Sequence, residues 1–166
     1  MLIFLVGYMG SGKSTLGKSL ARKLMMEFCD MDALIEKQEM CSTSEIFADK
    51  GEEYFRSLET QCLKNMSNEQ NLVVATGGGA PCFNENMDIM NQKGDTVYLD
   101  IKPGILTSRL KMGKAKRPLI ASKTDEELLE FVEQALEYRN NFYRKAKYII
   151  KGDNIKVDDI IKALKD

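Results

Sequence analysis

The sequence contains no histidine and no tryptophan, and only three of its 166 residues are proline. Without histidine, no Ser-His or Cys-His nucleophile pair can form, so a general base must be Asp, Glu, Lys, Tyr or water. The four cysteines form no C-x-x-C pair and have no histidine as a co-ligand, which argues against a zinc site. We expect them to be reduced thiols of a cytoplasmic protein.

Long apolar runs and an excess of one charge are also missing. No run approaches about 18 residues, so we expect neither a membrane span nor a membrane partner. The apolar start has the length of a strand and lacks a basic region, so we do not expect a signal peptide. A formal net charge of −1 gives no reason to expect nucleic acid as a partner. The length fits a single domain over residues 1–166, and the lack of a long heptad pattern favours a monomer.

Short apolar runs alternate with stretches of helical periodicity. The runs that we expect to form strands are Leu2–Val6, Glu27–Asp30, Leu72–Thr76, Thr96–Asp100 and Tyr148–Lys151. Capping boxes of the type S/T-x-x-E at Ser42 and Thr124 predict two helix starts. We also expect Asn84 to cap a helix through Lys93, and a final helix over residues 155–164. This alternation predicts an α/β fold, with a parallel sheet covered by helices on both faces.

A phosphate-binding loop follows the first apolar run. The segment Gly7-Tyr8-Met9-Gly10-Ser11-Gly12-Lys13-Ser14 matches the P-loop pattern G-x-x-x-x-G-K-S. Its glycines let backbone N–H groups turn towards phosphate oxygens, and the following helix adds the positive end of its dipole. Lys13 can reach the terminal phosphates of a nucleotide, and the Ser14 hydroxyl can bind Mg²⁺. A glycine-rich turn without a ligand is the alternative.

Two further polar segments follow predicted strand ends, where ligands bind in open parallel sheets. Asp30 and Asp32, two residues apart on an extended chain, would point the same way. One could hold Mg²⁺ through water while the other accepts a hydroxyl proton, although Asp32 could instead be a helix N-cap. The glycines Gly77–Gly79 could bring backbone N–H groups close to a ligand, or form a flexible turn before Pro81.

Two arginines have positions with more than one interpretation. Arg139 falls inside an apolar stripe at helical spacing, so its guanidinium requires an anion, a buried acidic partner or an escape to the surface. Arg56, taken alone, is typical of a surface residue paired with Glu59 three positions later. If both arginines lie at the same rim, they would form a clamp for a carboxylate or phosphate.

The polar, basic segment Lys111–Lys123 is typical of a lid that closes over a triphosphate. Arg117 or Lys116 would then bring positive charge to the transferring phosphoryl group. An ordinary solvated loop is the alternative. Arg109, just before this segment, could stack on a nucleotide base.

Taken together, these motifs resemble those of shikimate kinases in order and spacing, nearly from end to end. The shared motifs are Gly7–Ser14, Asp30-x-Asp32, Phe55-Arg56, Gly77–Gly79, Arg117-Pro118-Leu119 and Arg139. The resemblance implies a three-layer P-loop fold like that of nucleoside monophosphate kinases, with a five-stranded parallel sheet in the order 2-3-1-4-5. It also implies a mobile lid over about 111–124 and a substrate-binding helical segment over about 31–66. The implied reaction is ATP-dependent phosphorylation of the 3-hydroxyl of shikimate, on the route to chorismate and the aromatic amino acids.

The resemblance also implies roles for individual residues on the nucleotide side. The residues that would cradle the ATP phosphates are Gly10, Ser11, Gly12, Lys13, Ser14 and Thr15. Ser14 would bind Mg²⁺, with Asp30 in the outer shell of the metal. Arg117 would reach the phosphates from the lid, and Arg109 would lie over the adenine. The segment 151–154 lacks an arginine that some members place near the adenine, so contacts there stay open.

On the acceptor side, the resemblance implies that Asp32 holds the shikimate hydroxyl as a base or as an orienting group. Arg56 and Arg139 would clamp the carboxylate, and Gly78 and Gly79 would line the ring. Lys13, Asp32 and Arg117 would then be the catalytic residues.

Three other functions are alternatives. A kinase of the same fold could act on gluconate or on a nucleoside monophosphate, but Asp32 would repel a phosphate acceptor. A non-catalytic nucleotide-binding protein would be expected to lack Lys13, Asp32 or Arg117, and all three are present. A GTPase is rejected because the segment Asn91–Asp95 has one residue too many between Asn91 and Lys93 for a guanine-reading motif.

Overall fold

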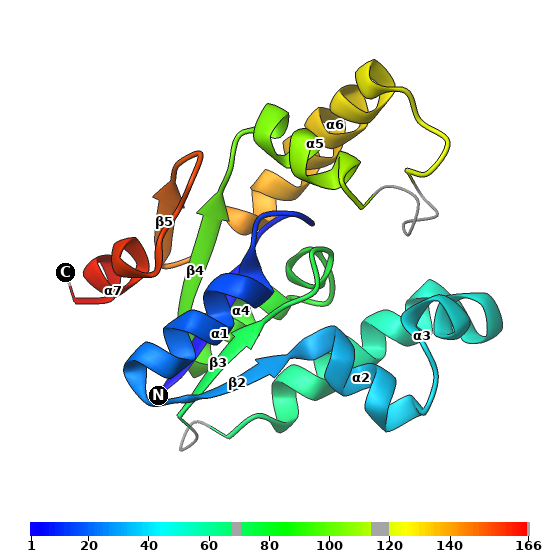
Figure 1. The fold of residues 1–166 in the computed structure, drawn as a ribbon. Coiled ribbons are helices and arrows are strands. Elements are labelled where there is room, and N and C mark those ends of the chain that lie inside the picture. The colour runs from blue at the N-terminus through cyan, green and yellow to red at the C-terminus, as the bar shows by residue number, and fades with distance from the viewer. Residues whose placement is uncertain (68–70, 114–119, 166) are drawn as a thin grey trace.

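The computed structural model describes residues 1–67, 71–113 and 120–165. Its centre is a parallel sheet in the order β2-β3-β1-β4-β5 (Figure 1). The strands are β1 (Leu2–Val6), β2 (Glu27–Asp30), β3 (Leu72–Ala75), β4 (Asp95–Asp100) and β5 (Tyr148–Lys151). The predicted strands and strand order are therefore confirmed, with shifts of one residue at the end of β3 and the start of β4.

The central strand β1 explains the apolar run at the start of the sequence. All its residues are buried, because it pairs with β3 on one side and β4 on the other while helices cover both faces. A parallel strand in this position has no solvent-facing side, so its sequence is continuously apolar rather than alternating. The edge strands β2 and β5 are more exposed.

Helices cover both faces of the sheet, and further helices lie above the strand ends and beside the edge strand β2 (Figure 1). They are α1 (Lys13–Leu24), α2 (Met31–Glu39), α3 (Thr43–Asn65), α4 (Asn86–Lys93), α5 (Pro103–Lys111), α6 (Asp125–Tyr143) and α7 (Val157–Lys165), with a 3₁₀ turn η1 (Ala80–Cys82). Helices α1 and α7 lie on one face of the sheet and α4 on the other, while α5 and α6 stand above the carboxyl ends of the strands. Helices α2 and α3 flank the edge strand β2. No helix among the described residues is long and apolar enough to cross a membrane.

Helix starts agree with the sequence at two of three predicted caps. Both capping boxes form, with Ser42 bonded to Glu45 and Thr124 bonded to the residue three positions later. The prediction that Asn84 caps α4 is wrong, because the cap position is Glu85, with φ of 57°. The Asn84 amide instead donates to the Thr60 hydroxyl oxygen on α3, at 3.1 Å.

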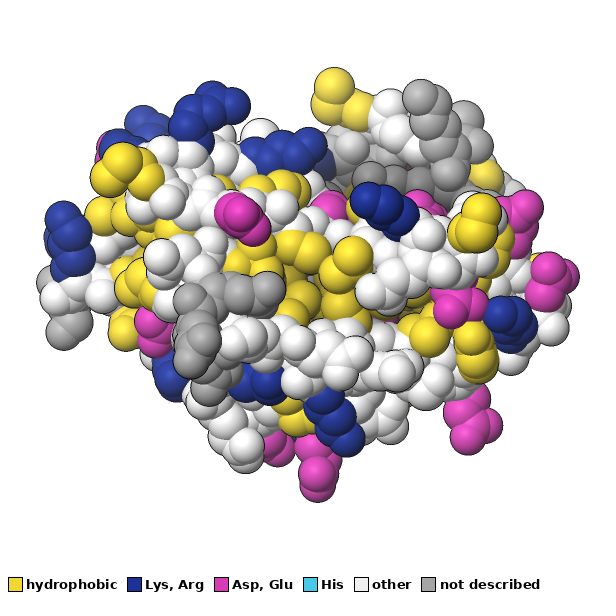
Figure 2. All heavy atoms as spheres, turned by 90° about the horizontal axis from the view of Figure 1, so that it is seen from below, with side chains coloured by type: hydrophobic (Ala, Val, Ile, Leu, Met, Phe, Trp, Pro, Cys, Tyr) yellow, Lys and Arg dark blue, Asp and Glu magenta, His cyan; other side chains and the backbone are white. Residues whose placement is uncertain are grey.

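The face of the molecule opposite the carboxyl ends of the strands gathers apolar side chains in a hollow (Figure 2). A groove of about 440 Å³ lies between β2, α2 and α3. Its apolar lining consists of Cys29, Leu34, Leu58, Cys62, Met66 and Leu72.

Close contact between α1 and the sheet depends on Gly17. A Cβ added to Gly17 would lie 2.6 Å from Cε2 of Phe28 on β2 and 3.3 Å from Cδ1 of Leu5 on β1. The first distance is shorter than any ordinary carbon contact, so the helix can approach the sheet this closely only without a side chain there.

We predict opposite effects for alanine at two helical glycines. Gly17→Ala should lower the free energy of unfolding by about 1–3 kcal/mol, because the methyl group overpacks against Phe28. Gly104→Ala in α5, where nothing lies within 4 Å of the added Cβ, should raise it by up to about 1 kcal/mol. Urea titrations of the two variants would measure both, and equal effects would contradict the packing argument.

Candidate active site

The polar segments predicted to share one rim do so. The P-loop follows β1, Asp30 ends β2, and residues 77–79 follow β3, so all lie at the carboxyl ends of neighbouring parallel strands (Figure 1). An added Cβ on Gly78 would lie 3.4 Å from the backbone nitrogen of Met9 and 3.6 Å from the carbonyl oxygen of Gly7. The glycine segment therefore packs directly against the P-loop.

The P-loop has the conformation that phosphate binding requires. Gly10 and Gly12 have φ of 82° and 94°, values that side chains rarely allow, and helix α1 begins directly afterwards. Its lysine lies over the loop: Lys13 Nζ donates to the carbonyl oxygens of Gly7 and Tyr8 at 2.7 and 3.0 Å. A cation and the N-terminus of a helix thus converge where phosphate would sit.

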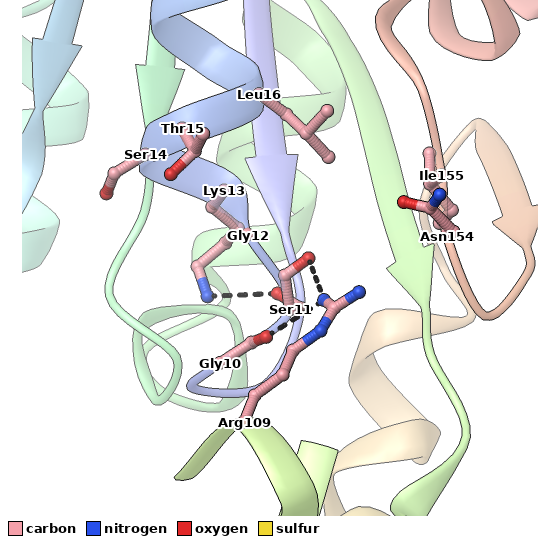
Figure 3. Close-up of a pocket in the computed structure, with 10 residues that line it drawn as sticks. All are labelled: Gly10, Ser11, Gly12, Lys13, Ser14, Thr15, Leu16, Arg109, Asn154 and Ile155. Atoms are coloured by element: carbon pink, nitrogen blue, oxygen red, sulfur yellow. Dashed lines mark hydrogen bonds between the residues drawn. The ribbon is translucent and has the colours of Figure 1, made fainter. Parts of the chain in front are cut away.

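A cavity of about 520 Å³ opens beside the loop (Figure 3). It is lined by Gly10, Ser11, Gly12, Lys13, Ser14, Thr15, Leu16, Arg109, Asn154 and Ile155. Arg109 reaches the loop from α5, where Nη1 donates to the carbonyl oxygen of Gly10 at 3.1 Å and Nη2 to that of Asp153 at 3.1 Å. Asn154 and Ile155 face the loop from the segment after β5, a contribution that the sequence left open.

Ser14 and Asp30 meet at the start of α1. The Ser14 hydroxyl donates to Asp30 Oδ2 at 2.7 Å, and Asp30 Oδ1 accepts from the backbone nitrogen of Ala33 at 3.3 Å. Asp30, not Asp32, is therefore the N-cap of α2, and Asp32 lies in the first turn of that helix. The expectation that Asp30 and Asp32 lie on one extended chain is wrong, because strand β2 ends at Asp30.

The three glycines after β3 each leave room for a charged side chain. A Cβ on Gly77 would lie 2.8 Å from Asp32 Oδ1 and 2.9 Å from Glu59 Oε1. On Gly78 it would lie 3.4 Å from Arg139 Nη1, and on Gly79 it would lie 2.6 Å from Arg56 Nη2. The absence of Cβ atoms in this segment therefore makes room for these charged groups.

Two carboxylates approach one another beside Gly77. Asp32 Oδ1 and Glu59 Oε1 are buried and have no hydrogen-bond partner among the described residues. Burial raises the pKa of Asp32, and the Asp30 carboxylate raises it further. Burial also raises the pKa of Glu59 to about 7, with Arg56 opposing the shift. Such unpaired buried acceptors are costly unless a donor binds there.

The two arginines differ in how their charges are balanced. Arg56 donates to the fully buried Glu59 at 2.8 Å and to Glu52 at 3.2 Å, so the predicted pair with Glu59 forms but is not a solvated surface pair. Arg139 makes no ion pair with a carboxylate within the described ranges 1–67, 71–113 and 120–165. The sequence left three environments open for Arg139, and a buried acidic partner among these described residues is therefore excluded.

Aromatic and polar groups that the sequence did not assign complete this side of the rim. The Arg56 guanidinium lies 4.2 Å from the ring centre of Phe83. The Tyr143 hydroxyl donates to the carbonyl oxygen of Gly78 at 2.5 Å. Tyr143 ends α6 and Phe83 follows η1, and no sequence pattern distinguishes either from a core residue. Arg117, predicted to act from the lid, lies outside the described residues.

The cysteines contribute no bonds to the site. All four are free thiols, and none of the described residues forms a group of three or more His, Cys, Asp or Glu side chains that could hold a metal ion. Cys82, in η1 beside the glycine segment, is buried, and burial raises its pKa to about 11 against the opposing charges of Arg139 and Arg56.

The fold and the P-loop define the class as a P-loop protein of the nucleoside monophosphate kinase type. A family model described as shikimate kinase matches residues 9–166. A shikimate kinase of Phocaeicola vulgatus is 47% identical over 153 residues, which cover 92% of this chain and 87% of that protein. The chain belongs to the shikimate kinase family.

Solved structures agree with this assignment. A crystal structure of shikimate kinase from Bacteroides thetaiotaomicron has a TM-score of 0.91 and 43% identity, covering 99% of this chain and 96% of that one. A shikimate kinase from Acinetobacter baumannii in complex with shikimate has a TM-score of 0.83 and 34% identity, covering 99% and 90%. The chain is thus a kinase whose reaction is the phosphorylation of shikimate.

Replacing Gly79 should impair acceptor binding more than it impairs folding. In Gly79→Ala the methyl group would occupy the position of the Arg56 guanidinium, which must move. We expect the KM for shikimate to rise roughly tenfold to a hundredfold, since displacing a positioning group by about 1 Å has effects of this size. The KM for ATP is the internal control, and an equal change in both constants would refute the prediction.

The Glu59 carboxyl should make stability depend on pH. Its pKa is raised in the folded protein, so its contribution is fully present below about 4.5 and is lost as pH rises through about 7. The gain in unfolding free energy from Glu59→Gln should therefore grow between about pH 5 and 8, by on the order of 1–3 kcal/mol. Denaturant titrations would measure this, with the exposed Glu52→Gln as a matched control; a gain that does not change with pH would contradict it.

Proposed function

We propose that the enzyme transfers the γ-phosphoryl group of ATP to the 3-hydroxyl of shikimate, giving shikimate 3-phosphate and ADP. One observation carries the assignment of the acceptor pocket. Among the described residues, the Arg139 guanidinium has no carboxylate partner and Asp32 Oδ1 has no hydrogen-bond partner, and they lie against the adjacent glycines Gly78 and Gly77. An acceptor that carries both a carboxylate and a hydroxyl matches this pair.

On the nucleotide side, we assign the phosphates to the P-loop residues 10–15. Lys13 would exchange the two carbonyl oxygens that it now contacts for phosphate oxygens. Arg109, Asn154 and Ile155 would surround the adenine at the other end of the cavity. Arg117, from the proposed lid over about 111–124, would add positive charge at the transferring group.

The residues at the start of α1 fit a magnesium ion. The Ser14 hydroxyl and an Asp30 carboxylate oxygen, 2.7 Å apart, are the hard oxygen donors that Mg²⁺ prefers. A metal held by only one or two protein groups, with phosphates and waters completing its shell, is typical of nucleotide sites. Ser14 would bind the ion directly and Asp30 through water. When bound, the ion neutralises charge on the β- and γ-phosphates.

On the acceptor side, Asp32 Oδ1 would accept the hydrogen bond of the reacting hydroxyl and orient its oxygen towards the phosphate. The raised pKa of Asp32 makes it a better proton acceptor than an ordinary carboxylate. Arg139 would bind the carboxylate, together with Arg56, while Gly78 and Gly79 let the ring approach the backbone. The segment of about 31–66 would thus be the acceptor-binding part of a single kinase domain spanning residues 1–166.

We also propose that the enzyme is a cytoplasmic monomer. Four free thiols fit a reducing compartment. The net charge of −1 provides little electrostatic attraction for nucleic acid or anionic lipid.

The test is ADP production from Mg-ATP with shikimate, gluconate or AMP as acceptor. We expect strong stimulation by shikimate alone, and its loss when divalent cations are chelated. Asp32→Asn should lower kcat by roughly 100-fold, the scale of a lost proton acceptor. Arg139→Ala should raise the KM for shikimate roughly 10- to 100-fold, as expected for a lost charge-assisted hydrogen bond. If no acceptor stimulates ADP production while ATP still binds, the proposal is rejected.

A further inference from the structure

Tyr8, at the second position of the P-loop, is buried more deeply than a loop residue needs to be. Only 1% of its surface is exposed, which ranks it among the largest fully buried side chains. Most x positions of a P-loop serve only to supply backbone N–H groups. The burial of a whole aromatic ring here therefore calls for a further explanation.

The ring of Tyr8 lies against the guanidinium of Arg139. Arg139 Cζ is 5.0 Å from the centre of the Tyr8 ring, within the range of a cation–π contact. Arg139 has no carboxylate partner among the described residues, and the Tyr143 hydroxyl and the face of the Tyr8 ring both stabilise its charge. A long arginine side chain loses considerable conformational freedom when held in one position, so something must hold it.

We propose that Tyr8 is a positioning residue that holds Arg139 ready for the carboxylate of the acceptor. This inference rests on the proposed function, in which Arg139 binds that carboxylate. On this proposal, the P-loop serves both substrates: its backbone faces the phosphates, and the ring of its second residue orients the acceptor clamp.

The backbone of the same residue contacts the nucleotide side. The carbonyl oxygen of Tyr8 accepts from Lys13 Nζ at 3.0 Å and from the backbone nitrogen of Ser11 at 3.1 Å. The backbone hydrogen bond from Ser11 does not depend on Lys13, so it helps to set the position of the Tyr8 ring within the loop. Arg139 is therefore aligned relative to the P-loop as well as to its own helix.

The hydroxyl group of Tyr8 is not needed for this role. Tyr8 Oη is buried and has no hydrogen-bond partner among the described residues. A buried hydroxyl without a partner costs stability, so removing it should do no harm. The proposal thus assigns the function to the ring face and predicts that phenylalanine will substitute for tyrosine.

The experiment compares steady-state constants and thermal stability of four single variants and one double variant with those of the parent. Tyr8→Leu removes the ring, and Tyr8→Phe keeps it. Phe4→Leu removes another fully buried ring, in β1, and serves as the control for a general loss of packing. Arg139→Ala tests the proposed role of the arginine itself, and the double variant Tyr8→Leu/Arg139→Ala closes the cycle.

We expect Tyr8→Leu to raise the KM for shikimate roughly threefold to thirtyfold, the factor that corresponds to a cation–π contact, while kcat and the KM for ATP stay within about twofold. Tyr8→Phe should match the parent. In the Arg139→Ala background, Tyr8→Leu should add no further rise in the KM for shikimate.

Three outcomes would overturn the proposal. Tyr8→Leu could leave the KM for shikimate unchanged although Arg139→Ala raises it, or it could change all constants as Phe4→Leu does. The two single variants could also raise the KM independently, so that their effects multiply in the double variant. If Arg139→Ala itself leaves the KM for shikimate unchanged, the proposed role of Arg139 fails instead, and the two failures are thereby distinguished.

Discussion

The close approach of three glycines to four charged side chains is the constraint on which the rest of the site depends. Asp32 comes from α2, Arg56 and Glu59 from α3, and Arg139 from α6. They can meet because the chain between β3 and η1 has no Cβ atoms where their charged ends lie. Since this segment also packs on the P-loop, the acceptor groups and the nucleotide loop are held in one arrangement.

Charge balance follows from the same arrangement. Arg56 is neutralised by the buried Glu59, whereas Arg139 has no carboxylate partner among the described residues and rests on an aromatic ring. One arginine is therefore fixed as part of the scaffold, and the other keeps its charge available. In the proposed clamp, an acceptor carboxylate would therefore meet one guanidinium that already has an acidic partner and one that has none among the described residues.

Most of the fold could be predicted from the sequence, because the buried parallel strands are short apolar runs and the helices between them carry periodic stripes and capping boxes. The P-loop was predictable from its spacing and Arg139 from its unusual charge on an apolar stripe, whereas Asp32 lies in α2 and not on the extended chain that its spacing suggested. The prediction for Asn84 failed because an asparagine that caps a helix cannot be told by sequence from one whose side-chain amide bonds to α3. Tyr8, Phe83 and Tyr143 have the sequence of core residues, and only tertiary contacts with arginines or glycines distinguish them.

The burial of the Cys82 thiol, beside the glycine segment, limits its reactivity towards covalent inhibitors. Burial raises its pKa to about 11, so the nucleophilic thiolate is a minor form at neutral pH even though two guanidinium charges lie nearby. Electrophilic warheads aimed at this cysteine would react slowly.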